Sequence, residues 1–237
     1  MTDKAIMTFS IIIPVLHEGE GLLSLIDDLH TLRPEIPHEI IVVDGGPGSD
    51  TLEALGERKD IIALVSPPGR ARQMNKGAGM ARGKVLLFLH ADTVLSDGWV
   101  REVHTLIDRI GTGDKPDTAA AFRFALDDEG IKPRLLEAAV AFRCAVFKLP
   151  YGDQGLLISR RRYDALGGFK PLKIMEDVDL VRRIPRRERL MLRTKAMTSA
   201  ARYRRDGYLK RPLRNLTCLT LYTLRAPSTW IERLYGQ

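Results

Sequence analysis

The 237-residue chain has only two cysteines, few aromatic residues and no long hydrophobic run. Cys144 and Cys218 lie in apolar stretches without the spacing of metal ligands, which argues against a disulfide scaffold and indicates buried thiols. The N-terminus lacks the apolar segment of a signal peptide, and no later run is long enough to span a bilayer, so we expect a cytoplasmic protein. The glycines match neither the dinucleotide fingerprint nor the phosphate loop.

Hydrophobic residues make up 44% of the chain, enough to build the core of one large domain or of one domain with an extension. The formal net charge is +7, and the excess lies in the second half of the sequence. Arginines gather in Arg160–Arg162, Arg182–Arg189 and Arg202–Arg214. This pattern has two interpretations: a solvated charged face, or a site for an anionic partner such as a phosphorylated substrate, a membrane surface or nucleic acid.

The first half alternates strand-like and helix-like segments. The strand-like segments are Phe9–Val15, Glu39–Val43, Ile61–Val65 and Val85–Leu89. The helix-like segments between and after them are Gly19–Leu32, Ser49–Arg58, Gly69–Arg82 and Asp97–Ile110. Repeated strand–helix units with short links predict a mostly parallel central sheet with right-handed crossovers, flanked by helices.

The pattern becomes less regular after Gly111. The expected strands are Ala119–Leu126, Leu156–Ser159 and Leu190–Arg193, and the expected helices are Pro133–Phe147, Glu176–Ile184 and Tyr208–Leu224. We therefore predict an α/β protein with a single Rossmann-like domain over residues 8–195, divided at 110/111, and a helical C-terminal extension over residues 196–237.

The segment VLLFLHADT at residues 85–93 is the most informative one. Val85–Leu89 is uniformly apolar, as in a strand buried on both faces, and it is followed by His90-Ala91-Asp92. Side chains alternate along a strand, so His90 and Asp92 point to the same side. Ligands of open α/β sheets bind beyond the carboxyl ends of the strands, which makes this pair a candidate metal site.

Three other segments carry polar residues at suitable places. Asp44 ends the second strand, before glycines that let a ligand approach the backbone. Arg72 and Lys76 share a face near the start of the third helix, where a diphosphate could bind. Glu176 and Asp177 open a short helix, where carboxylates can cap the helix or act as a general base.

Together these segments resemble the family 2 glycosyltransferases, which have a nucleotide-diphosphosugar transferase (GT-A) fold. The resemblance covers about residues 8–185 and follows the order of the family's motifs. The motifs HADT at residues 90–93 and GDQG at residues 152–155 are similar to those of a bacterial subgroup described as arsenosugar-biosynthesis-type. The matching segments are Ser10–Glu18, Ile41–Thr51, Gly69–Ala78, Val85–Thr93, Gly152–Gly155, Gly167–Phe169 and Glu176-Asp177.

The resemblance implies a role for each matching residue. Residues 8–110 would bind the nucleotide and residues 111–195 would face the acceptor. Asp44 would recognise the base, Asp92 would bind the metal with His90 beside it, and Asp177 would be the catalytic base. The implied nucleotide-sugar site consists of Pro14, Leu16, Glu18, Asp44, Arg72, Asn75, His90, Ala91 and Asp92; the implied acceptor site consists of Asp153, Gln154, Glu176 and Arg182.

The sequence departs from the family pattern at three places. His17 stands where the family usually has Asn. Pro47 replaces a serine, and Asp50 lies one position later than the usual aspartate. His90 replaces the first acidic residue of the metal motif. A nitrogen ligand at His90 would suit Mn²⁺ better than Mg²⁺.

The resemblance implies an inverting glycosyltransferase that uses a divalent metal, Mn²⁺ or Mg²⁺, a nucleotide-diphosphosugar donor and an unknown hydroxyl acceptor, and that binds no nucleic acid. A nucleotidyltransferase would need a basic glycine-rich loop after the first strand, and VLHEGEG is acidic there. A third alternative is a non-catalytic sugar-nucleotide-binding or membrane-docking module. The presence of both Asp92 and Asp177 argues against it.

The C-terminal segment 209–224 has leucines at helical spacing with basic residues around them. Three interpretations stay open for this amphipathic helix. It could lie on the inner face of a membrane, pack on its own domain, or form a homodimer contact.

Overall fold

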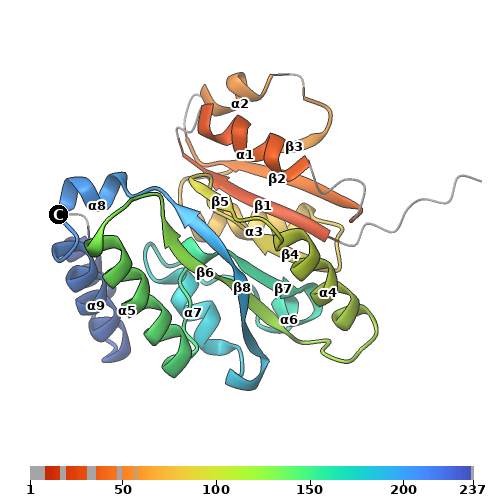
Figure 1. Ribbon diagram of the computed structural model, residues 1–237. Helices are drawn as coiled ribbons and strands as arrows, with labels where there is room; N and C mark the ends of the chain where they lie inside the picture. The colour runs from red at the N-terminus through yellow and green to blue at the C-terminus, as the bar shows by residue number, and fades with distance from the viewer. Residues whose placement is uncertain (1–8, 17–19, 31–35, 47–49, 57, 236–237) are drawn as a thin grey trace, which may run out of the picture.

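The computed structural model describes residues 9–16, 20–30, 36–46, 50–56 and 58–235. Its strands are β1 (Phe9–Val15), β2 (His38–Asp44), β3 (Ile61–Val65), β4 (Val85–Phe88), β5 (Thr93–Leu95), β6 (Ala119–Leu126), β7 (Leu156–Ser159) and β8 (Arg189–Thr198). They form one eight-stranded sheet in the order β3-β2-β1-β4-β7-β6-β8-β5 (Figure 1).

The half of the sheet that comes from the first strands of the chain is parallel, as predicted. β1 pairs in parallel with β2 and β4, and β2 pairs in parallel with β3. The other half is mixed, because β7 is antiparallel to both β4 and β6, whereas β6 is parallel to β8. The short edge strand β5 is antiparallel to β8 and was missed from the sequence. The predicted α/β class with a mostly parallel sheet is confirmed.

Helices cover both faces of the sheet (Figure 1). They are α1 (Glu20–His30), α2 (Asp50–Leu55), α3 (Arg70–Met80), α4 (Trp99–Gly111), α5 (Ile131–Phe147), α6 (Arg160–Ala165), α7 (Glu176–Arg183), α8 (Ala201–Asp206), α9 (Lys210–Thr223) and α10 (Ser228–Tyr235). Two short 3₁₀ turns, η1 (Gly152–Gln154) and η2 (Arg186–Glu188), precede β7 and β8. The predicted C-terminal helix Tyr208–Leu224 is α9, and the helical extension also contains α8 and α10, which were not predicted individually.

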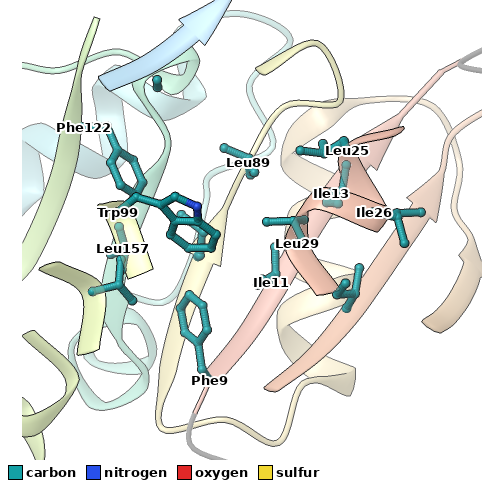
Figure 2. Packing of buried hydrophobic residues seen from close by; sticks show 14 of the residues in the cluster. Phe9, Ile11, Ile13, Leu25, Ile26, Leu29, Leu89, Trp99, Phe122 and Leu157 are labelled. Carbon is teal, nitrogen blue, oxygen red and sulfur yellow. The ribbon is translucent and has the colours of Figure 1, made fainter. Parts of the chain in front are cut away.

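The two largest hydrophobic clusters of the core follow the alternation of side chains along the strands. Ile11 and Ile13 of β1 pack on one face with α1, and the same cluster extends to Trp99 and Phe122 (Figure 2). Ile12 points to the other face, into a cluster that includes residues of α3, α6 and α7. Cys218 of α9 and Ile231 of α10 are also buried in this second cluster. The C-terminal helices are therefore packed against the domain.

Gly77 lets α3 pack directly on β1 and β2. A Cβ atom at this position would lie 2.5 Å from Cγ2 of Ile12 and 3.1 Å from Cγ2 of Val43. We expect Gly77→Ala to lower the free energy of unfolding by about 1–3 kcal/mol through overpacking. Gly79 is the matched control, because it lies on the same helix and nothing lies within 4 Å of its added Cβ.

Gly79→Ala is expected to raise the free energy of unfolding by about 0.5–1 kcal/mol, since alanine loses less entropy in a helix. Urea titration of the two variants measures the difference. Equal stability of Gly77→Ala and Gly79→Ala would contradict the close packing.

Candidate active site

The ends of β1 and β2 are joined by a side chain that the sequence reasoning missed. Nε2 of Gln73, on α3, donates hydrogen bonds to the carbonyl oxygens of Val15 (2.7 Å) and Val43 (2.8 Å). The backbone N–H of Gly45 adds a hydrogen bond to the same Val15 oxygen at 3.0 Å. Gln73 is itself buried, so these bonds fix the edge of the sheet beyond which a ligand would lie.

Asp44 lies at this edge and is almost fully buried. Its Oδ1 accepts a 2.7 Å hydrogen bond from the N–H of Gly46, whereas its Oδ2 has no hydrogen-bond partner among the described residues. A buried carboxylate oxygen without a partner is costly, so it suits a bound ligand. Leu16 is half exposed beyond β1, Pro14 is buried within β1, and Glu18 lies outside the described residues.

A pocket opens beyond β4 and brings together residues that are distant in the sequence, from Arg70 to Tyr235. His90 and Asp92 line it, as do Asp153 of η1 and Asp177 of α7. The sequence did not indicate the part of the lining that comes from α3, from the end of β8, from the C-terminal helices and from the segments around η1 and the start of α7. These additional residues are Arg70, Tyr151, Ile174, Met175, Val178, Thr198, Ser199, Arg202, Tyr203, Arg211, Asn215 and Tyr235.

The carboxylate of Asp177 is held in place by two backbone N–H groups. Oδ2 accepts a hydrogen bond of 2.6 Å from Gly152, and Oδ1 accepts one of 2.8 Å from Val178. A Cβ atom at Gly152 would lie 3.1 Å from both Asp177 Oδ2 and His90 Nε2, so the absence of a side chain there allows this approach. Each carboxylate oxygen has a second lone pair, which leaves Asp177 able to accept a proton.

Burial shifts the ionisation of the groups around Asp177. It lowers the pKa of His90 to about 4, and the positive charge of Arg70 contributes to the same shift. His90 is therefore a neutral imidazole at pH 7. Burial also raises the pKa of Asp153 to about 6, with Asp177 and Asp92 adding to the rise and Arg143 opposing it. The pocket thus concentrates acidic groups around a neutral histidine.

Arg70, rather than Arg72, reaches the pocket from the start of α3. Its Nε lies 2.7 Å from Oε1 of Glu176, which is fully buried. Burial raises the pKa of Glu176 to about 7 and the negative charge of Asp177 adds to the rise, although Arg70 opposes it. Arg72 is exposed and does not line the pocket. Glu176 therefore lies next to the catalytic candidate Asp177 and forms an ion pair with an arginine at the start of α3.

Three other predicted site residues have their polar groups engaged by the protein. The amide of Asn75 bonds both the N–H and the carbonyl of Phe169 and accepts a bond from Tyr163. Gln154 is buried and bonds Phe122, Tyr151 and Arg143. Arg182 donates to Thr223 on α9, away from the pocket. Ala91 is half-buried and packs against the hydrophobic cluster of α1 and α4.

The pocket's donor set fits a divalent cation that takes few protein ligands. No group of three or more His, Cys, Asp and Glu side chains is arranged to hold a metal within the described ranges. Mg²⁺ needs fewer, since it often takes one or two carboxylates and completes its shell with phosphate oxygens and water. Oδ1 of Asp153 is buried in the same pocket and has no hydrogen-bond partner among the described residues, so a cation there would offset part of the negative charge of the acidic groups.

Comparison with known proteins agrees with this architecture. Residues 10–140 match the family model described as glycosyl transferase family 2. No curated protein matches the chain. Glucosyl-3-phosphoglycerate synthase from Mycobacterium tuberculosis, solved in complex with phosphoglyceric acid, is similar with a TM-score of 0.64 and 18% identity, over 94% of this chain and 82% of that one. The S. aureus TarS 1-349 structure is similar with a TM-score of 0.58 and 14% identity, over 96% of this chain and 69% of that one.

Proposed function

Because the chain belongs to glycosyl transferase family 2, we propose that it moves a sugar from a nucleotide-diphosphosugar to an acceptor hydroxyl with inversion at the anomeric carbon. The observation that carries this proposal is the carboxylate of Asp177. It is held by the N–H groups of Gly152 and Val178 in a pocket that also contains Arg70 and Asp92.

The proposed reaction is a single displacement. The acceptor oxygen attacks the anomeric carbon from the face opposite the diphosphate, and the bond between this carbon and the diphosphate oxygen breaks. Asp177 takes the proton of the acceptor hydroxyl, and the nucleoside diphosphate leaves with the bonding electrons. Attack from the opposite face inverts the anomeric centre.

The remaining roles follow from where the side chains lie. Asp44 would accept a hydrogen bond from the base or ribose with its unpartnered Oδ2. Arg70 would contact the diphosphate from the start of α3, and Glu176 holds its guanidinium in place at 2.7 Å. Asp153 lines the same pocket and would contact the acceptor or the transferred sugar.

Asp92 and His90 would hold a divalent metal, Mn²⁺ or Mg²⁺. The metal would supply positive charge next to the departing diphosphate. The neutral state of His90 at pH 7 leaves a ring nitrogen with a free lone pair, which a metal ligand needs. Asp92 provides the carboxylate oxygen that either metal accepts.

A thermal-shift screen of nucleotide-diphosphosugars with and without Mn²⁺ tests the donor and the metal together. A donor at 100 times its Kd is expected to stabilise the protein by about 2.7 kcal/mol. Asp92→Ala should abolish the part of this shift that depends on Mn²⁺, whereas Asp114→Ala, at an exposed aspartate, should leave it unchanged. Equal shifts with and without Mn²⁺ in the wild type would contradict the metal role.

Release of nucleoside diphosphate from the stabilising donor then tests turnover. Transfer or slow donor hydrolysis supports the enzyme, and binding of donors without any turnover would support a non-catalytic module instead. The resemblance to the arsenosugar-type subgroup stays a prediction about the sugar and acceptor, which the same screen addresses.

A further inference from the structure

A second cavity lies between α5 and α9 and adjoins the active-site pocket. It is a groove of about 850 Å³, within the usual range for small-molecule sites. Figure 1 shows these two helices side by side along one flank of the molecule. The centre of the groove is apolar, with Val140 and Phe142 on α5 and Leu216 and Leu219 on α9.

One end of this α5–α9 groove opens into the active-site pocket. Asp153, Tyr203 and Asn215 line both cavities, and Tyr151 also lines both. A ligand in the groove can therefore place one of its ends beside the acidic groups of the pocket. This continuity makes the groove an extension of the acceptor side and not a separate site.

The opposite end of the groove is cationic. Arg182, Arg186 and Arg189 line it, near the C-terminal ends of α5 and α9. Arg186 donates to the carbonyl oxygen of Val146 at 2.6 Å, and Arg182 donates to Oγ1 of Thr223 at 3.1 Å. Burial lowers the pKa of Arg189, and the charges of Arg186 and Arg182 lower it further.

These three arginines have no carboxylate partner within 4.0 Å in the part of the chain that the structure describes. Neutral groups and solvent, and not a carboxylate, reduce the repulsion between their like charges: the arginines donate to backbone carbonyls and to Thr223, and Arg182 lies over the ring of Tyr222. A carboxylate or phosphate group would relieve this repulsion and could accept charge-assisted hydrogen bonds. The far end of the groove thus has the chemistry of an anion site.

Large apolar side chains remain exposed along the mouth of the groove. The exposed fraction is 67% for Phe142, 56% for Phe147 and 57% for Leu216. Exposed apolar groups that line a cavity mark a binding surface, because burying them under a ligand is favourable. The groove between its two ends therefore suits a hydrocarbon chain.

We propose that the α5–α9 groove binds the acceptor, and that this acceptor is an amphiphile with a hydroxyl at one end, an apolar chain, and an anionic group at the other end. The inference rests on the proposed function, since it is the pocket at Asp177 that makes the hydroxyl end an acceptor. Along α9, the distance from Asn215 to Thr223 is about 12 Å at 1.5 Å per residue. A chain of medium length spans this distance.

Binding of two defined probes, measured by isothermal titration calorimetry on the full chain, tests the proposal. ω-Hydroxydodecanoate carries a hydroxyl, a long apolar chain and a carboxylate, whereas ω-hydroxybutanoate has the same end groups on a short chain. We expect the long probe to bind at least tenfold more tightly. Equal Kd values for the two probes would overturn the proposal.

Each groove variant has a matched control at an exposed position of the same helix. Leu216→Glu and Phe142→Glu place a carboxylate in the groove, and both should raise the Kd of the long probe by roughly tenfold or more. Leu213 and Leu135 lie on the same two helices, are each 65% exposed and do not line the groove. Leu213→Glu and Leu135→Glu should leave the Kd within twofold.

A third variant tests the cationic end. Arg186→Gln should weaken binding of the long probe severalfold. It should not change the affinity for dodecanol, which lacks the anionic group.

Two outcomes would assign the groove differently. If the groove variants and the control variants weaken binding of the long probe equally, the exposed leucines form a general membrane contact. Loss of self-association in Leu216→Glu, with no probe binding to the wild type, would assign the groove to a second copy of the chain. Either result overturns the proposal.

These outcomes are separate from those of the proposed function. Probe binding needs no donor. If the probe binds in the groove but no sugar is transferred, the result counts against the transferase, and the groove is still the binding site of the amphiphile. Conversely, Leu216→Glu could leave donor turnover unchanged with every acceptor tested. This result would support the transferase and would show that the groove is not part of its acceptor site.

Discussion

Asp177→Asn is expected to slow sugar transfer by roughly 10³-fold while the Kd of the donor stays within a few fold, as for the removal of a general base. The amide of asparagine is neutral and cannot take the proton of the acceptor hydroxyl. The donor contacts proposed at Asp44 and Arg70 do not involve this side chain, so donor binding should persist.

The same substitution also tests the structure around the base. Asparagine has only one acceptor oxygen, so it can keep the hydrogen bond from Gly152 or the one from Val178, but not both. Donor affinity and melting temperature therefore have to be measured together with the rate. Retained donor binding attributes the loss of rate to the missing base and not to a displaced η1 turn.

Asp114→Asn is the control for this experiment, because Asp114 is exposed and forms only a surface ion pair. It should transfer sugar at the wild-type rate. If Asp177→Asn kept a rate within tenfold of the wild type, Asp177 would not be the base, and the proposed displacement would need another proton acceptor.

Asp179→Ala is expected to lower the free energy of unfolding by about 3–5 kcal/mol, as for a broken buried ion pair. Asp179 is almost fully buried and joins three segments of the chain. Its carboxylate lies 2.8 Å from Nε of Arg183, 3.2 Å from Nζ of Lys170 and 2.7 Å from the hydroxyl of Tyr222 on α9. Its removal would leave the Arg183 charge uncompensated.

Melting temperature and urea titration measure this effect, and a fall of roughly 10 °C corresponds to the expected loss. Asp114→Ala is the matched control, because Asp114 also lies 2.8 Å from an arginine, Arg109, but at an exposed position. Its loss should cost only about 0–1 kcal/mol. Similar losses of unfolding free energy in the two variants would show that burial does not strengthen the Asp179 ion pair.

The contribution of Asp179 should depend on pH. Burial alone would raise its pKa, but the hydrogen bonds from Tyr222 and Lys170 and the charge of Arg183 hold the pKa below its ordinary value. A carboxyl with a lowered pKa stabilises the folded state above the unfolded pKa of about 3.9, and this stabilisation is lost as the pH falls through the folded pKa. The difference between wild type and Asp179→Ala should therefore be full at pH 7 and shrink below about pH 4.

The sequence predicted the parallel half of the sheet well because its strands have uninterrupted apolar runs, so β1, β2, β3 and β4 agree closely with the predicted segments. β1, β2 and β4 are almost fully buried, whereas β3 lies at the edge of the sheet and is partly exposed. β5 was missed because it has only three residues, and β8 extends beyond the predicted Leu190–Arg193 because its exposed and buried residues alternate irregularly. Pairing direction in the second half depends on contacts between distant segments, which no local pattern records.

The same limit explains why the sequence pointed to Arg72 and not to Arg70. Arg72 shares a helix face with Lys76, which is a local criterion, but it does not line the pocket. Arg70 lines the pocket and lies 2.7 Å from Glu176, which is distant in the sequence, so no local pattern indicates it. Asp92 and Asp177 were found because each directly follows or opens a recognisable element, and the structure places both in one pocket.

The wall of the pocket has a consequence for biosynthesis. Arg202, Tyr203, Asn215 and Tyr235 reach the pocket from helices that the ribosome makes after every strand of the sheet. The parallel strands of the first half of the chain can pair while these helices are still inside the exit tunnel, since domains fold from the N-terminus during synthesis. A nascent chain can therefore form the parallel half of the sheet before the C-terminal wall of the pocket exists, and translation itself sets the order in which the two parts of the pocket form.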